Sequence, residues 1–380
     1  ERFNISINEA RILQASLRPN PVLGVEANYL DVFGAGFDPA RSAAGPTEVS
    51  ARLDFLMERG AKRRNRIAVA EAEKSIAQME LLDLTRSLKL DVQNSFTDVL
   101  LAQQSLSIAS ESLSAFNRIV AINQVRVDSG DLARVELVRS EVAALQFRNQ
   151  LRQAELRLRL AKTRLQTLIG RRLLDPNFQV AGDMRQDAAD VQRDQVLQQA
   201  IASRPDLEAL RRDQTRAQAE IRLQLAQGKM DLSVGAGYNR QLNVGPGQRG
   251  DSAGIFFSVP IPFTNRNQGE IQRARLQSQQ VEARIRVLEQ QIESEVTNAF
   301  EQYRTSRDLL QSIERDMIQQ ASRVREVISF SYQRGEATFV EFLDAQRTFN
   351  ETRQALLDAK AEYAKSLFLI EAISGRRIGN

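Results

Sequence analysis

The sequence repeats itself once over nearly its whole length, and this repeat limits what the chain can fold into. Two turn glycines, Gly130 and Gly335, each precede a helical stretch that ends in a Gly-Arg-Arg sequence, at Gly170 and at Gly375. The two copies are offset by about 205 residues, and each must supply the same set of elements. A further matched pair lies upstream, at residues 23–29 and residues 232–238.

Very long helices are the second feature of the sequence. Residues 61–126 contain no proline and no glycine, and Leu84, Leu88 and Val92 recur at the spacing of one helix face. At 1.5 Å per residue, a helix over this range would be roughly 100 Å long. Such a rod has almost no core of its own and must pack sideways against other helices. Ala, Leu, Gln, Arg and Glu dominate these stretches, which is typical of long helices and coiled coils.

The composition excludes several classes of chemistry. There is no cysteine, which excludes disulfides and thiolate metal sites, and no histidine, which excludes imidazole catalysis and the usual transition-metal ligands. The net charge of +4 is small beside 52 basic and 48 acidic residues, so nucleic-acid binding is not expected. No Gly-rich phosphate loop follows a strand, and no acid pairs with a histidine or cysteine. We therefore predict neither an enzyme nor a cofactor.

The predicted segments follow the repeat in order. They are 1–19, a helix end; 20–58, a first β-hairpin; 59–172, a first long helical hairpin; 173–205, an irregular segment with a short helix; 206–229, a helix; 230–263, a second β-hairpin; 264–376, a second long helical hairpin; and 377–380, a tail. Loops are predicted at 34–47 and 241–251. The last strand is predicted from the apolar positions Ile255 to Ile261 and is ended by Pro260 and Pro262, and a helix of about 60 residues is predicted over roughly 268–330. No apolar run is long enough for a transmembrane helix. Because the first residues match the end of a helix in the repeat, we expect a leader and some mature sequence before them.

The predicted strands alternate apolar and polar residues, as in Leu23, Gly24, Val25 and Glu26, so the sheet has two different faces. Four strands cannot close a barrel and would leave two edges exposed. Three chains would supply twelve strands and remove every edge, and even-numbered barrels of this kind span membranes. Two helical hairpins per chain would extend such a barrel as a helical tube. The geometry therefore favours a conduit, with a soluble coiled-coil scaffold as the open alternative.

Five short stretches resemble motifs of a known family. They are residues 18–23, 58–63, 204–207, 257–263 and 265–271. Together they resemble the TolC-like outer membrane efflux factor family, and within it the CzcC-type branch, over essentially the whole chain. The resemblance implies a mainly α fold with β-strands, in which the four strands contribute to a trimeric twelve-stranded outer-membrane β-barrel. It also implies that the long antiparallel helices form a periplasmic α-barrel.

The resemblance also implies a function and partners. Members of the family are homotrimers in the outer-membrane lipid that extend into the periplasm. They serve as the exit duct of a tripartite pump, with a periplasmic adaptor (a membrane fusion protein) and an inner-membrane RND transporter. The CzcC-type branch implies export of divalent heavy-metal cations such as cobalt, zinc, cadmium or nickel. A duct for multidrug efflux or for type I protein secretion would look the same in sequence. The adaptor itself is disfavoured, because adaptors carry one hairpin flanked by small β-domains.

Two acids after the second turn are candidate pore residues. Glu341 and Asp344 are three residues apart and share one helix face. In a trimer they would form two stacked acidic rings, and the family places rings at these positions that constrict the entrance and attract cations. Solvated surface acids are the plainer reading of the two residues alone. With no histidine, no cysteine and few methionines, we expect metal ions to pass without a tight binding site.

A second candidate site is a gate at the tip. Tyr332 and Glu136 match a pair that in the family bonds between helices and keeps the tip closed. The match is incomplete, because Ala337 occupies the position of the family's gating arginine and Val135 that of a neighbouring hydrogen-bonding residue. The sequence therefore predicts a lock that is weaker or differently connected.

The two turns are the candidate adaptor contacts. Gly130 and Asp131 form the first tip, and Gly335 and Glu336 form the second, where the family seats adaptor hairpins. An ordinary turn would also place glycine at these positions. The basic run at residues 62–66 is expected to be a solvated helix start, with contact to lipid phosphates as the alternative.

Overall fold

The computed structural model describes residues 2–29, 47–187, 190–242 and 250–375. These residues fall into two compact units, each described here by itself: residues 1–81 with 205–288, and residues 82–204 with 289–380. The predicted mainly α fold with β-strands is confirmed, because long helices accompany one four-stranded antiparallel sheet. Most of the two predicted loops and the whole predicted tail lie outside the described residues. Among the described helices, none is both long and apolar enough to cross a membrane.

Eight α-helices account for most of the described chain. They are α1 (Arg2–Ser16), α2 (Lys62–Asp128), α3 (Arg134–Leu168), α4 (Arg193–Ser203), α5 (Pro205–Gln227), α6 (Gln268–Ser312), α7 (Ile318–Arg334) and α8 (Phe339–Ser374). Two of them, α2 and α6, contribute residues to both units.

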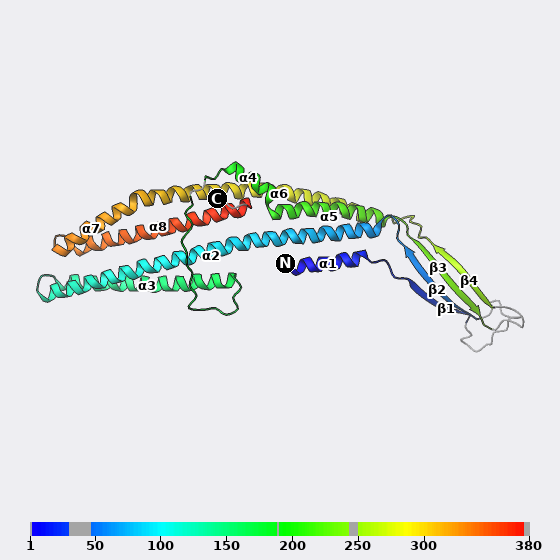
Figure 1. Ribbon diagram of the computed structural model, residues 1–380, viewed down its shortest axis with the longest axis horizontal. Helices are drawn as coiled ribbons and strands as arrows, with labels where there is room; N and C mark the ends of the chain where they lie inside the picture. Colours follow the sequence, from blue (N-terminus) through cyan, green and yellow to red (C-terminus); the bar gives the residue numbers. More distant parts are fainter. Residues whose placement is uncertain (1, 30–46, 188–189, 243–249, 376–380) are drawn as a thin grey trace. The chain divides into compact units, whose positions relative to one another are not determined.

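The sheet of the first unit contains both hairpins of the repeat. Its strands are β1 (Val22–Asn28), β2 (Glu48–Met57), β3 (Leu232–Gln241) and β4 (Asp251–Ser258), and they lie side by side in this order (Figure 1). The two copies are joined by the antiparallel pairing of β2 with β3. The prediction that the last strand reaches Ile261 is wrong. The strand ends at Ser258, because Pro260 has no amide hydrogen and restricts the residue before it.

A network of charged side chains ties the start of α2 to the residue after β2 and to the segment before β3. Lys62, which is 8% exposed, donates to the Asp231 carboxylate at 2.7 Å and to the Lys229 carbonyl at 2.9 Å. Arg66 pairs with Glu58. The expectation of a solvated basic helix start is therefore wrong for Lys62 and Arg66, because both cations are bound within the unit.

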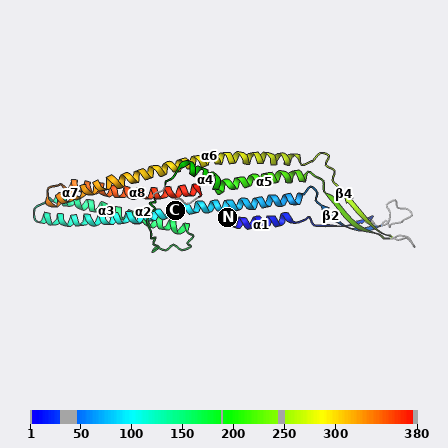
Figure 2. The ribbon, with the colours of Figure 1, turned by 45° about the horizontal axis from the view of Figure 1, so that its top comes forward.

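The second unit is built from two antiparallel helical hairpins. In Figure 2, α3 runs back along the C-terminal part of α2, and α8 runs along α7. Near the two turns the hairpins share a cluster of buried apolar side chains. Its members are Phe116, Ile119, Ala143, Ala144, Phe147, Tyr332, Phe339 and Phe342. Phe116 of α2 contacts Phe342 of α8 with ring centroids 5.9 Å apart, so aromatic packing holds the two hairpins together at this end.

The helix predicted over about 268–330 contains one irregular turn. A π-helical turn, Ile313–Met317, separates α6 from α7. The side chains on the inward face show why: Leu310 and Ile313 are buried, Met317 is exposed, and Ile318 is the next residue turned inward. A step of five residues from Ile313 to Ile318 fits a π-turn and not an α-helix.

The irregular segment after α3 crosses the helices of the second unit. Met184 packs in a small core with Leu100 of α2 and with Ala361 and Ala364 of α8. Arg185 forms an ion pair of 2.8 Å with Glu371, whose side chain is 6% exposed. The segment thus ties a helix of the first copy to a helix of the second.

Candidate functional site: the two helical tips

Both tips end their first helix with the same backbone motif. Gly130 has φ of +85° and Gly335 has φ of +82°, the left-handed region that favours glycine. The amides of Asp131 and Glu336 donate to the carbonyls of Arg126 and Ser331, at 2.8 and 2.9 Å. The amides of Gly130 and Gly335 donate to the carbonyls of Val127 and Tyr332, at 3.1 and 3.0 Å, which completes the Schellman motif in both turns. The repeat therefore holds at the level of single hydrogen bonds.

The two tips differ directly after the turn. In the second tip, Thr338 and Glu341 form a capping box: the Glu341 carboxylate accepts from the Thr338 amide at 2.7 Å and from its hydroxyl at 2.8 Å. In the first tip Ala133 has no side chain that can cap, and Glu136 instead accepts from Arg139 at 2.7 Å. The chemistry of the tips has therefore diverged although the backbone has not.

The two predicted pore acids lie together beside a groove. Glu341 and Asp344 are exposed on α8 and line a groove of about 530 Å³ between α7, α8 and the π-turn. Its other walls are mainly apolar and include Met317, Val324 and Ile328. The hydrogen bonds from the Thr338 amide and hydroxyl lower the pKa of the Glu341 carboxyl, so it is ionised at neutral pH. By the repeat, Arg139 stands where Asp344 stands, so the doubled acids belong to the second copy alone.

The predicted gate pair does not bond within the chain. The Tyr332 hydroxyl donates to Oδ1 of Asn123 at 2.7 Å, and both residues are buried, while Glu136 is engaged with Arg139. Burial raises the pKa of the Tyr332 phenol, although the bond to Asn123 opposes this, so the hydroxyl remains a donor. Tyr332 therefore does link two hairpins, but through Asn123 rather than Glu136.

Arg126 provides a second link at the same level. Its guanidinium donates to the Tyr332 carbonyl at 3.5 Å, from the first hairpin to the second. Sequence reasoning missed both Asn123 and Arg126. A signal was available for Asn123, because it continues the helix face of Phe116 and Ile119, where an apolar residue is expected. The family's arginine position is occupied by Ala337, but this tip does contain an arginine, Arg126, which comes from α2.

Further from the tips, two polar bonds also join the hairpins. Arg347 of α8 donates to Gln146 of α3 at 2.7 Å, and Arg353 of α8 pairs with Glu111 of α2 at 2.7 Å. The hydrogen bond from Arg353 lowers the pKa of the Glu111 carboxyl. These bonds replace apolar packing where the aromatic cluster ends.

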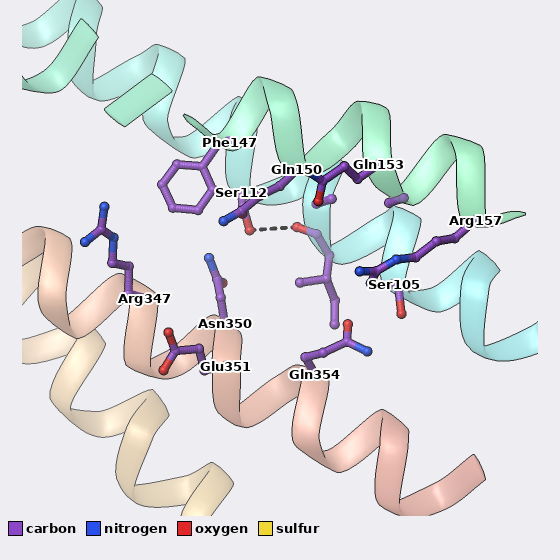
Figure 3. Close-up of a pocket in the computed structure, with 13 residues that line it drawn as sticks. Ser105, Ser112, Phe147, Gln150, Gln153, Arg157, Arg347, Asn350, Glu351 and Gln354 are labelled. Atoms are coloured by element: carbon purple, nitrogen blue, oxygen red, sulfur yellow. Dashed lines mark hydrogen bonds between the residues drawn. The ribbon is translucent and has the colours of Figure 1, made fainter. Parts of the chain in front are cut away.

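A polar cleft lies between α2, α3 and α8 beside these bonds (Figure 3). It measures about 280 Å³ and is lined mostly by Ser, Gln, Asn and Arg side chains. The Ser112 hydroxyl inside it is used by its own helix, donating to the Ile108 carbonyl at 2.7 Å. Within the described residues there is no group of three acids, histidines or cysteines that could hold a metal ion.

Two known proteins are similar to the chain over most of its length. The chain is 24% identical to the cobalt-zinc-cadmium resistance protein CzcC of Cupriavidus metallidurans, over 97% of this chain and 84% of that protein. It is 25% identical to the cation efflux system protein CusC of Escherichia coli K12, over 89% of this chain and 73% of that protein.

A solved structure of CusC has the same fold, with a TM-score of 0.77 and 20% identity over 99% of this chain and 88% of that one. That structure describes CusC during folding and the formation of a transmembrane channel. The sequence profile described as Outer membrane efflux protein matches residues 8–171 and 196–376, both copies of the repeat. The chain belongs to the outer membrane efflux protein family.

Proposed function

We propose that the chain is the outer-membrane exit duct of a three-part RND-type pump that exports divalent heavy-metal cations. The observation that carries the proposal is the family match over both copies of the repeat, together with relatives named for cobalt-zinc-cadmium resistance and cation efflux. Proteins of this family work with a periplasmic adaptor and an inner-membrane transporter. The duct is passive in this proposal, and the transporter selects the ion.

A homotrimer in the outer-membrane lipid is part of the proposal. The sheet has two edges, β1 and β4, whose outer sides need partners in a membrane. Three copies would supply the twelve strands of a closed barrel. The exposed apolar residues on one face of the sheet, such as Val25, Ile255 and Phe257, support contact with lipid.

The tips carry the proposed control of the duct. Glu341 and Asp344 would form acidic rings that attract cations and narrow the entrance. Tyr332, bonded to Asn123, and Glu136 would hold the tip closed. Gly130 with Asp131, and Gly335 with Glu336, would present the bare turns on which an adaptor hairpin sits.

Planar bilayers test the proposal directly. We expect the purified wild-type protein to form cation-preferring channels, and Glu341→Ala combined with Asp344→Ala to raise conductance and weaken the cation preference. The reason is that the double variant removes both carboxylates of all three chains from the entrance. Unchanged conductance and selectivity in the double variant would exclude the ring assignment.

Glu336→Ala is the matched control for that experiment. It removes one exposed acid per chain from the same tip, but from the turn rather than from the groove. No adaptor is present in the bilayer, so this variant is expected to conduct as the wild type does. An equal effect of Glu336→Ala would mean that any acid at the tip acts on the current.

A further inference from the structure

The two faces of the sheet differ in chemistry. The register of the strands places Leu53, Val234 and Phe257 on one face, which is apolar. Arg52, Asp54 and Phe256 lie on the opposite face. In a membrane barrel the apolar face meets lipid and the polar face meets the water of the lumen. The polar face is therefore the wall along which ions would pass.

One arginine on the polar face is held by two neighbours. Arg52 Nε donates to Asp54 Oδ1 at 2.8 Å. Its guanidinium carbon lies 4.5 Å from the centre of the Phe256 ring, a cation–π contact. Arg52 and Asp54 are on β2, whereas Phe256 is on β4, so these contacts reach across β3.

Two glycines of β3 make this reach possible. Gly237 lies opposite Arg52 and Gly235 opposite Asp54 in the strand register. A Cβ at Gly235 would overlap the Asp54 carboxylate, and one at Gly237 would lie 2.9 Å from the Phe256 ring. Because both positions on β3 are glycines, the side chains of Arg52, Asp54 and Phe256 can lie directly over the β3 backbone.

The charges on this face favour cations, and the place of Arg52 decides how strongly they do so. In the described strands the polar face carries one guanidinium, Arg52, and three carboxylates, Asp54, Glu26 and Glu48. Rings of arginine in a pore favour anions, and rings of acids favour cations. An arginine released from its partner would add positive charge to the lumen and extend into the path.

We propose that Asp54 is a specificity-determining residue of the duct: it neutralises Arg52 and, with Phe256 and the two glycines, holds it against the barrel wall. This proposal rests on the proposed function, because it needs the polar face to line a lumen. It concerns the barrel and is independent of the acids at the tips.

A double-mutant cycle read by reversal potential in planar bilayers tests the proposal. The proteins are wild type, Asp54→Ala, Arg52→Gln and the double variant. Arg52→Gln leaves the Asp54 carboxylate without its counter-charge, so it raises the cation-to-anion permeability ratio in the wild type. If Asp54 holds Arg52 against the wall, the same change raises the ratio more in the Asp54→Ala background, where a released Arg52 extends into the path. Asp54→Ala lowers the ratio severalfold and reduces conductance, and adding Arg52→Gln restores both. Equal effects of Arg52→Gln in the two backgrounds would overturn the proposal.

Glu26→Ala supplies the matched control. It removes one carboxylate from the same face, but no ion pair joins Glu26 to Arg52 in the described strands. Its effect and that of Arg52→Gln should simply add, and strong coupling between them would contradict the assignment of Asp54 as the partner. If Asp54→Ala does not reach the membrane, Asp54→Asn serves in the same cycle. A wild type without channels, or without cation preference, would instead contradict the proposed function.

Discussion

At the scale of single residues, the bond between Tyr332 and Asn123 is the part of the tip most open to test. Tyr332 is 3% exposed and Asn123 is 0% exposed, and the Asn123 Nδ2 atom has no hydrogen-bond partner among the described residues. Tyr332→Phe keeps the stacking on Phe342, whose ring lies 5.0 Å away, but removes the donor to Asn123. We expect the local free energy of opening to fall by about 1–3 kcal/mol, because a buried amide is left unpaired. Hydrogen exchange of the α2 and α7 amides near the tip measures this.

The control for Tyr332→Phe is the same change combined with Asn123→Leu. Replacing both polar partners by apolar groups removes the unpaired amide, so the double variant should recover most of the lost protection. Protection that is unchanged in Tyr332→Phe, or no better in the double variant, would show that the bond contributes nothing to the closure of the tip.

Residue types and spacing predicted which side chains of the tip share a helix face, but not which hydrogen bonds they form. The pairing of Glu341 and Asp344 on one face followed from helix periodicity, and the structure places both beside one groove. The partner of Tyr332 did not follow, because Asn123 is 209 residues away along the chain. Only the packing of α2 against α7 brings them together. Likewise Glu341 serves as a cap, which depends on the backbone at Thr338.

At the scale of elements, the two turns provide a comparison within one molecule. Gly335→Ala forces a side chain into the left-handed region, which costs roughly 1–2 kcal/mol. Its Cβ would also lie 3.2 Å from the Arg126 guanidinium, which holds the Tyr332 carbonyl. Gly130→Ala has the same backbone strain, but no atom lies within 4 Å of its Cβ. We expect Gly335→Ala to destabilise its tip more than Gly130→Ala does, as measured by hydrogen exchange at the turns.

Equal losses in the two glycine variants would mean that the Arg126 contact is not important for the tip. No loss in either would mean that the turns can adopt another conformation. The stability losses of the two variants can be compared directly, because both glycines close the same Schellman motif.

The helices and strands followed from periodicity, with two exceptions of known cause. Proline at position 260 ended the last strand early, although the alternation of apolar residues continued beyond it. The π-turn at Ile313–Met317 interrupted the longest predicted helix of the second copy. The five-residue step between Ile313 and Ile318 was visible in the sequence, but alone it is easily taken for an ordinary gap in an apolar face.

At the scale of the whole molecule, the repeat in sequence does not correspond to the units in space. Each unit contains part of both copies, since the first takes residues 1–81 and 205–288. The repeat predicted one β-hairpin and one long helical hairpin per copy. It could not predict that β2 pairs with β3, because that register depends on how the two copies meet. The two faces of the sheet, in contrast, followed directly from the alternation of residue types.

The edges of the sheet lead to the last prediction, which concerns assembly. Strands β1 and β4 each have one side without a partner in the described chain, and neither edge could face lipid unpaired. We expect membrane-extracted protein in detergent to have the native mass of about three chains of 42.7 kDa, and to aggregate when detergent is removed. A monomer or dimer that stays in solution without detergent would mean that the strands form an ordinary sheet. The helices would then form a coiled-coil scaffold, and neither the acidic rings nor the Arg52–Asp54 pair would line a channel.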